Sequence, residues 1–365
     1  MSPPSLLAAR NPLKVSGTLL PPNLLLAAKL LALVFILKHN PGKFPEPFLA
    51  FVPALEQLGS PQLFQTALQL VFWAAVPFLF FNWHVRAACL VIGADILLSV
   101  LASRANYSNN LTYTALFFIL TGLYDPRVGR TLIRYQLALV YFGATLNKVL
   151  EPDWRSGAFV QAWLPHYLDV YPWIAAKLPG NLLSAVLGWL GILTELALVP
   201  LLLIKRLVPA ALVLGAAYHT GLVVLTWGST FNMFWPATLA TFLALMEWPA
   251  SVTVRYAPSS RWQQGARRLL APLDLEGRYT WLEQQAGRLE TEQGPGRVHT
   301  GAPALAQLLL YSPVVYFGFA LLTWRVPKSI PLLLLLLAVV VYGAVQRGWG
   351  PWRSRLPPLV PRRST

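Results

Sequence analysis

The stretch LLSAVLGWLGILTELALVPLLLI, residues 182–204, decides the class of fold. Glu195 is its only ionisable side chain, and the stretch is long enough for a helix to cross a bilayer, which takes about 20 apolar residues. Lipid offers the peptide backbone no hydrogen-bond partners, so a stretch of this kind is stable there only as a helix. The segment therefore predicts a transmembrane helix.

Comparable apolar blocks lie on both sides of this segment. Of the 365 residues, 56% are hydrophobic and only 12% are charged, whereas soluble domains carry about 25% charged residues. Further core spans are expected at residues 19–37, 63–81, 85–102, 111–124, 133–150, 207–227 and 231–248. Two later blocks, 304–324 and 330–345, predict a C-terminal membrane hairpin. The expected fold class is an all-α polytopic membrane protein with about eight core transmembrane helices.

The polar stretch at residues 249–303 interrupts this pattern and predicts a small α/β-like cytoplasmic unit. Within it, residues 251–256 alternate like a strand, 259–270 are typical of a helix, 278–282 of a second strand, and 290–301 of a glycine-rich loop. The expected regions are an N-terminal cytoplasmic segment (1–18), a transmembrane domain (19–250), the polar unit with two apolar helices (251–347) and a basic disordered tail (348–365).

The net charge of +15 has a simple explanation in a membrane protein, because Lys and Arg gather in cytoplasmic loops. With the N-terminus inside, the short inside loops contain Arg86, Arg127, Arg130, Arg134, Lys205 and Arg206. This predicts a cytoplasmic N-terminus and C-terminal region and an external loop at residues 151–180, in a periplasm or lumen. A bacterial inner membrane is the expected location. Nucleic acid is not an expected partner, since no basic-aromatic surface motif accompanies the charge.

Ionisable side chains within apolar spans are candidates for function, because burying them in lipid is costly. Lys148, Glu195, His219, Asp95 and Lys29 are of this kind. A lysine in an apolar site can lose its proton, since desolvation disfavours the charged form, and it can then act as a general base. Simpler roles stay open: the lysines can reach the interface, the histidine can be a hydrogen-bonded core residue, and the two acids can join helices. The single cysteine, Cys89, can form neither an internal disulfide nor a CxxC pair.

Several short motifs resemble those of the HTTM family, the horizontally transferred transmembrane domain shared with vitamin K-dependent gamma-carboxylases. The matching segments are Val140-Tyr141-Phe142-Gly143-Ala144, Asn147-Lys148, Asp153-Trp154 with Gly157, Ser108-Asn109-Asn110-Leu111-Thr112-Tyr113, and Ala217-Tyr218-His219-Thr220. The family's motif lysine is regarded as the carboxylase base, and it matches Lys148. Glu195 lies where the family often has an acid.

This resemblance implies a carboxylase-like enzyme that uses a quinone or hydroquinone dissolved in the membrane. Lys148 would be the general base, and His219 would orient a substrate or stabilise negative charge. The residues implied to bind substrate or cofactor are Tyr141, Asn109, Asn110, Tyr113, Trp154, Gly157 and Glu195; no metal ligand is implied.

This chain departs from the carboxylase pattern at two positions. Leu111 stands in place of a histidine, and Asn147 in place of the first of two lysines. The alternatives are therefore a non-catalytic membrane protein that binds a lipid, a quinone or a partner protein, and a small-molecule transporter.

The polar unit resembles, more distantly, a DCC-type thioredoxin-like domain, which often follows the HTTM domain. In that family a strand precedes Tyr-Asp-Gly-Asp-Cys-x-x-Cys and a helix; here Ser260 and Gln263 replace the two cysteines. Gly301-Ala302-Pro303-Ala304-Leu305 and residues 342–347 resemble later motifs of the same domain. The resemblance implies a degenerate domain over residues 251–347 without dithiol chemistry, which requires thiolates.

Overall fold

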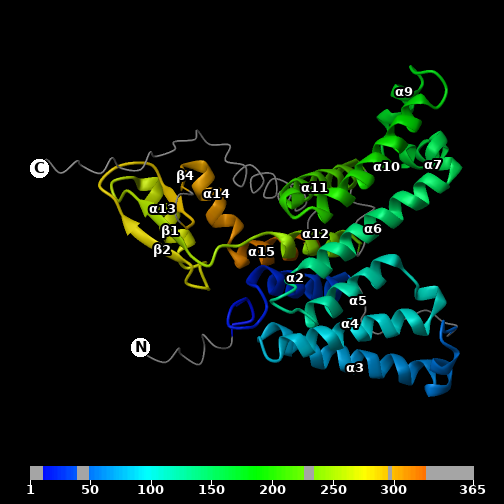
Figure 1. Cartoon of the computed structure of the whole chain (residues 1–365), viewed down its shortest axis with the longest axis horizontal. Helices are drawn as coiled ribbons and strands as arrows, with labels where there is room; N and C mark the ends of the chain where they lie inside the picture. Colours follow the sequence, from blue (N-terminus) through cyan, green and yellow to red (C-terminus); the bar gives the residue numbers. More distant parts are fainter. Residues whose placement is uncertain (1–10, 39–48, 226–233, 295–297, 326–365) are drawn as a thin grey trace, which may run out of the picture.

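The computed structural model describes residues 11–38, 49–225, 234–294 and 298–325. Long helices form a bundle, and a small sheet with its own helices lies at one end of it (Figure 1). The principal helices of the bundle are α2 (Pro22–Lys38), α3 (Pro61–Phe80), α4 (Val85–Ala102), α5 (Asn109–Gly122), α6 (Thr131–Leu150), α10 (Leu182–Leu203), α11 (Val208–Leu225) and α12 (Phe234–Leu245). Each apolar block expected before residue 250 thus contains one helix. Short 3-10 helices η1 (Pro53–Leu58), η2 (Arg104–Asn106) and η4 (Lys205–Leu207) occupy connections.

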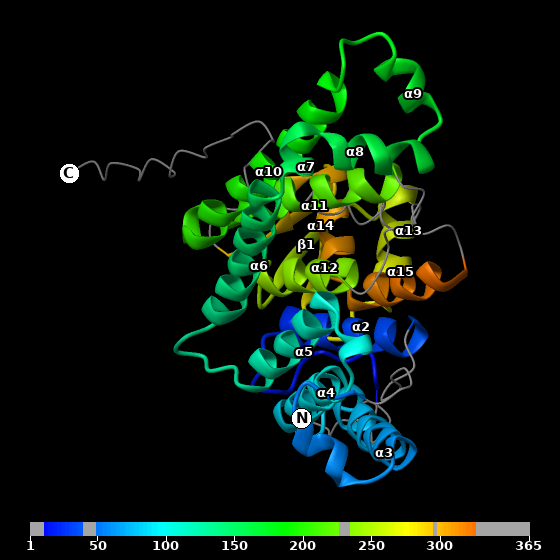
Figure 2. The same cartoon turned by 90° about the vertical axis from the view of Figure 1, so that its right-hand side faces the viewer.

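Among the described residues, three helices are long and apolar enough to cross a membrane: α3, α4 and α10. α2 is a shorter apolar helix. The expectation of about eight core spans is therefore supported at three helices and stays a prediction for the others. Figure 2, which views α3 and α4 nearly along their axes, shows the long helices side by side.

Glycines let neighbouring helices of the bundle approach closely, as is common between membrane helices. A Cβ added at Gly93 of α4 would lie 2.7 Å from the carbonyl oxygen of Ala115 in α5. A Cβ added at Gly122 of α5 would lie 2.7 Å from the carbonyl oxygen of Arg86 in α4. No larger residue fits at either position without separating the two helices.

The segment between α6 and α10 folds into a compact unit, which we call the α7–α9 hairpin. It contains α7 (Pro152–Ser156), α8 (Ala158–Trp163), η3 (Leu164–His166) and α9 (Val170–Ala175). Val160, Leu164 and Tyr171 form a small core that packs on Leu183 and Leu187 at the start of α10. The hairpin is thereby fixed at the end of the bundle opposite the sheet (Figure 1).

The C-terminal unit contains a four-stranded sheet with strand order β2-β1-β3-β4. Its elements are β1 (Val252–Tyr256), α13 (Arg261–Leu270), β2 (Tyr279–Glu283), β3 (Glu290–Glu292), β4 (Val298–Thr300), α14 (Ala302–Leu310) and α15 (Pro313–Arg325). β1 pairs with β2 in parallel and with β3 antiparallel, and β3 pairs antiparallel with β4. The hydroxyl of Tyr279 donates to the carbonyl oxygen of Leu308, which ties α14 to the sheet.

Two expectations for this region were wrong. Residues 290–301 were expected to be a loop, but they contain β3 and β4, because β3 completes the hydrogen bonding of the edge of β1 and buries Thr291. Residues 304–324 were expected to be one membrane helix, but the chain breaks at Tyr311 and Ser312 into α14 and α15. Pro313 explains the break, since proline disfavours helical geometry in the residue before it. The expected helix at 330–345 and the tail at 348–365 lie outside the described residues.

Lys29 holds the N-terminal segment against the bundle. Its side chain is fully buried, and its ammonium group donates to three carbonyl oxygens, those of Pro12 at 2.9 Å, Lys14 at 2.6 Å and Phe80 at 2.8 Å. Lys29 therefore contacts neighbouring segments, which was one of the expectations for it. The backbone N–H of Val15 donates to Glu276 of the C-terminal unit, so the N-terminal segment joins the bundle to the sheet.

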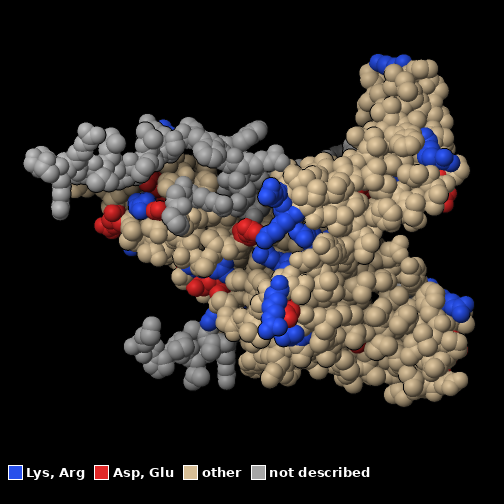
Figure 3. All heavy atoms as spheres, viewed as in Figure 1, with Lys and Arg blue, Asp and Glu red and all other residues tan. Residues whose placement is uncertain are grey.

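Basic side chains gather where the bundle meets the C-terminal unit, while most of the visible bundle surface carries no charge (Figure 3). Arg130, just before α6, donates to the carbonyl oxygens of Ala244 and Met246 at the end of α12. Asn23 donates to the same two carbonyls. A cation at this position also interacts favourably with the negative end of the helix dipole.

Candidate functional site

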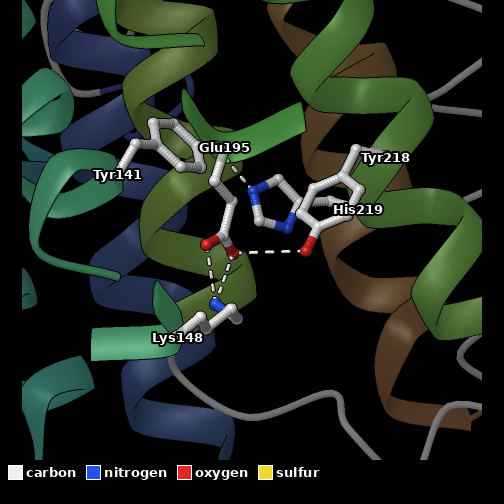
Figure 4. Close-up of polar contacts among 5 residues, drawn as sticks. All are labelled: Tyr141, Lys148, Glu195, Tyr218 and His219. Atoms are coloured by element: carbon white, nitrogen blue, oxygen red, sulfur yellow. Dashed lines mark hydrogen bonds and ion pairs between the residues drawn. The ribbon is translucent and has the colours of Figure 1, made fainter. Parts of the chain in front are cut away.

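Three helices bring five polar side chains together inside the bundle (Figure 4). α6 supplies Tyr141 and Lys148, which are about two helical turns apart and so share one face of the helix. α10 supplies Glu195, and α11 supplies Tyr218 and His219. The site therefore depends on the packing of α10 against both α6 and α11.

Lys148 and Glu195 form a largely buried ion pair. The ammonium nitrogen lies 2.8 Å from Oε1 and 2.6 Å from Oε2 of the carboxylate, and the two side chains are 16% and 8% exposed. The hydroxyl of Tyr218 donates to Oε1 at 3.2 Å. Removing two charges from water costs free energy. Their mutual attraction offsets this cost only when the geometry is good and other hydrogen bonds assist. This site meets both conditions.

A second polar pair lies beside the first. The hydroxyl of Tyr141 and Nε2 of His219 are 2.5 Å apart, and both side chains are buried. The tautomer of the histidine decides which atom donates. The Phe242 ring lies 6.3 Å from the His219 ring, between centroids, and a Cβ added at Gly215 would lie 2.3 Å from that phenylalanine ring. Gly215 thus makes room for the ring that packs on the histidine.

Trp154 covers the Lys148 end of the site. The lysine nitrogen lies 5.0 Å from the centroid of the indole ring, within the range of a cation–π interaction. Gly157 and Gly188 let this part of the chain approach α10. Gly157 has φ +81°, and an added Cβ there would lie 2.3 Å from the backbone nitrogen of Ala185. An added Cβ at Gly188 would lie 2.6 Å from the carbonyl oxygen of Trp154.

The remaining sequence candidates lie elsewhere. Tyr113 is buried and its hydroxyl lies 2.6 Å from Oγ1 of Thr241 in α12. Asn109 is exposed and its Oδ1 accepts from Tyr107, while the backbone N–H of Asn110 donates to Ser108. In the part of the chain that the structure describes, no hydrogen bond joins either asparagine to the Lys148 pair.

Asp95 lies in α4, is 2% exposed, and receives no hydrogen bond from the described residues. The hydrogen bond between helices that was one expectation for it is therefore not seen there.

Tyr218 is the residue that the sequence analysis missed. It appears in the quoted motif beside His219, but a tyrosine in an apolar helix is common and carried no signal of its own. Because neighbouring helix positions point in different directions, Tyr218 reaches the carboxylate of Glu195 while His219 reaches Tyr141.

No group of three or more His, Cys, Asp and Glu side chains among the described residues could hold a metal ion. Cys89 is buried within α4 as a free thiol. In the C-terminal unit, Gln263 has a structural role: its Oε1 accepts from the N–H of Ala257 at 2.8 Å, and its Nε2 donates to the carbonyl oxygen of Gly287 at 3.0 Å. Ser260 directly precedes α13.

Comparison with known families identifies one match. Residues 123–248 match the HTTM domain, a range that includes α6, the α7–α9 hairpin, α10, α11 and α12 and hence the whole Lys148–Glu195 site. No curated protein matches the chain, and no solved structure matches it. The chain is thus similar, over less than half its length, to membrane proteins with an HTTM domain, in agreement with its three long apolar helices.

Proposed function

We propose that this chain is an integral membrane protein of the HTTM family that binds a lipid-soluble quinone or hydroquinone beside Lys148 and exchanges a proton with it. The observation that carries the proposal is the buried pair of Lys148 and Glu195, with Tyr218 as a third partner. Ionisable groups of this kind in an apolar bundle are expensive and are retained where they serve a function.

The proposed membrane arrangement has about eight core spans, a cytoplasmic N-terminus and C-terminal unit, and the α7–α9 hairpin outside a bacterial inner membrane. α3, α4 and α10 support it by their length, and α5, α6 and α11 pack beside them. The gathering of Lys and Arg where the bundle meets the C-terminal unit supports the orientation (Figure 3).

The pair can supply a general base by an internal proton transfer. In the ion pair Lys148 carries the extra proton, and moving it from Nζ to a carboxylate oxygen of Glu195 leaves a neutral amine and a neutral acid. The amine lone pair could then accept a proton from a hydroquinone hydroxyl.

The other residues fit a planar ligand with an oxygen at its edge. The indole of Trp154 gives the surroundings of Lys148 an apolar, aromatic wall. The Tyr141 and His219 pair could stabilise an oxygen that gains negative charge. A bound hydroquinone would supply the reducing equivalents of a carboxylase-like reaction, which is the enzyme class proposed.

The proposal for the C-terminal region is a degenerate DCC-type thioredoxin-like domain that serves as a docking module. The order β1, α13, β2 supports it, as does the position of Ser260 and Gln263 where that domain has cysteines. Gln263 uses its amide to join Ala257 to Gly287. A packing contact has thus taken the place of a redox group.

A non-catalytic binding protein is the second candidate. It is favoured by one observation, namely that Lys148 contacts both carboxylate oxygens of Glu195. Such a closed pair joins α6 to α10 and can be purely structural.

The deciding experiment uses purified full-length protein in lipid nanodiscs with added menaquinone or ubiquinone. Binding is measured by extraction and by titration. Oxidation is measured separately on the pre-reduced quinol with ferricyanide as the added electron acceptor, a reaction that releases two protons per quinol. We expect the wild type to bind quinone and Lys148→Ala to abolish oxidation. Lys177→Ala is the matched control, because Lys177 also lies over an indole, that of Trp173, but on the exposed hairpin.

The outcomes of this experiment distinguish the proposed function from the non-catalytic candidate. Absence of quinone binding by the wild type overturns the proposed function. Binding without oxidation, unchanged in Lys148→Ala, supports the non-catalytic candidate.

A further inference from the structure

A row of aromatic rings leads away from Lys148 along the α7–α9 hairpin. Trp154 stacks on Phe159 with ring centroids 4.4 Å apart, Phe159 on Trp163 at 6.1 Å, and Trp163 lies 5.4 Å from Tyr167. The first two pairs are nearly parallel, with interplanar angles of 24° and 18°. All these separations are within the range of favourable aromatic contacts. The row begins at Trp154, beside Lys148.

The row is held in place by the small core of the hairpin, against which Trp154 and Trp163 pack. Val160 and Leu164 are buried against α10, one position after Phe159 and Trp163 respectively. Trp154 and Trp163 are partly buried and pack against this core, whereas Phe159 between them is 38% exposed. The rings therefore form a partly exposed row that the hairpin core supports from beneath.

The tip of the hairpin continues this apolar surface. Val170 is 46% exposed, Trp173 62% and Leu178 38%. The exposed surface passes on to Leu182 and Leu190 of α10, a helix long and apolar enough to cross a membrane. Continuity with the apolar surface of a candidate span indicates lipid as the medium that covers the hairpin.

Both views of the molecule place α9 beyond the rest of the bundle. It projects crosswise to α4 and α5, at the end of the bundle away from the sheet (Figures 1 and 2). A helix in this position would lie along a membrane surface. The ammonium group of Lys177 lies 3.2 Å from the centroid of the Trp173 ring, a combination typical of the lipid headgroup layer.

We propose that the α7–α9 hairpin lies in the lipid headgroup layer and that its aromatic row guides a membrane lipid with a planar head sideways to Lys148. The lipid contact of the hairpin is independent of the function proposed above, whereas the guiding of a quinone-type head to Lys148 rests on it. Aromatic faces suit this task, because they offer planar apolar contact at every step without a fixed hydrogen-bond requirement.

The first experiment tests the lipid contact alone. In a Cys89→Ala background, which removes the only native cysteine, a spin label is attached at Phe159→Cys or Ile174→Cys in nanodiscs. Collision rates with oxygen and with a water-soluble nickel complex then give the depth of the label. Leu190→Cys on the exposed face of α10 and Val298→Cys in the sheet are the lipid and water references, both exposed.

We expect the hairpin labels to lie at headgroup depth, with oxygen collisions more frequent than at Val298→Cys. Labels as accessible to the nickel complex as Val298→Cys would overturn the proposal, whether or not the protein binds quinone.

The second experiment tests guidance. Stopped-flow mixing with quinone-loaded vesicles measures association and dissociation rates for Trp163→Ala, with Trp189→Ala on α10 as the control of equal residue type and 41% exposure. A guiding row predicts that both rates of Trp163→Ala fall at least threefold with little change in affinity. Unchanged rates overturn guidance. If the wild type binds no quinone, the proposed function and guidance both fail, and the depth measurement alone decides the lipid contact.

Discussion

At the scale of single residues, Glu195 carries most of the candidate site, because Lys148 and Tyr218 both depend on its carboxylate. Sequence reasoning singled out Lys148, Glu195 and His219 because ionisable groups are rare in apolar helices. It could not predict that Lys148 contacts Glu195, since the two residues lie on different helices. A hydropathy pattern does not say which faces of two helices pack together. Whether these residues bind a ligand or catalyse a reaction remains a prediction.

Replacing Glu195 by Gln should destabilise the protein strongly, because the ammonium group of Lys148 would then be buried without its counter-charge. The expected loss in the free energy of unfolding is about 3–5 kcal/mol, measured by thermal unfolding in detergent. The double variant Lys148→Met with Glu195→Leu should recover most of the loss.

The control is Glu292→Gln, which breaks the more exposed pair of Arg255 and Glu292 and should cost at most about 1 kcal/mol. Equal effects of Glu195→Gln and Glu292→Gln would contradict a special role for the buried pair.

At the scale of elements, hydropathy located the helices of the bundle because each needs a continuous apolar stretch. It failed at residues 290–301 and 304–324 for different reasons. Glu290, Thr291 and Glu292 look polar enough for a loop, and their pairing to β1 is a long-range contact. The apolar run before Pro313 looks like half a span, but α14 buries Ala304 and Leu308 in the C-terminal unit.

The attachment of the α7–α9 hairpin to α10 should be sensitive to Gly157→Ala. The change adds a Cβ where φ is +81° and where the backbone nitrogen of Ala185 lies 2.3 Å away, so the hairpin must move. Hydrogen exchange should then rise at Val160 and Leu164, and the midpoint of thermal unfolding should fall.

Gly180→Ala is the comparison, because Gly180 has φ +52° but its added Cβ would meet nothing within 4 Å. That variant should lose only the backbone term of about 1–3 kcal/mol. If Gly157→Ala is no worse than Gly180→Ala, the close approach to α10 does not hold the hairpin.

At the scale of the whole molecule, the bundle and the C-terminal unit are joined through the N-terminal segment. Lys29 binds the carbonyls of Pro12 and Lys14, and Val15 binds Glu276. This connection could not be predicted from the sequence, because carbonyl oxygens exist at every residue and carry no residue-type signal.

Lys29→Met should therefore loosen the junction while leaving the helices intact. Three buried carbonyls lose their partner, so we expect faster hydrogen exchange at Val15 and easier proteolysis near residues 11–16, with unchanged helical circular dichroism. Lys14→Met is the control, since only the backbone carbonyl of Lys14 makes the relevant contacts. Equal protection of Val15 in wild type and Lys29→Met would refute the role of the buried lysine.

The carbonyl partners of Lys29 also bear on how the protein is made. Pro12 and Lys14 precede α2, but Phe80 ends α3 and is synthesised only after a whole further helix has been added. In the membrane arrangement proposed above, α2 is a span, and its lysine lacks part of its final coordination when α2 enters the insertion machinery. A lysine without its partners near the centre of a helix opposes insertion by about 2.5–3.5 kcal/mol. α2 and α3 should consequently enter the bilayer together as one biosynthetic unit, so that a ribosome-stalled chain ending before Phe80 would hold α2 only loosely in the membrane.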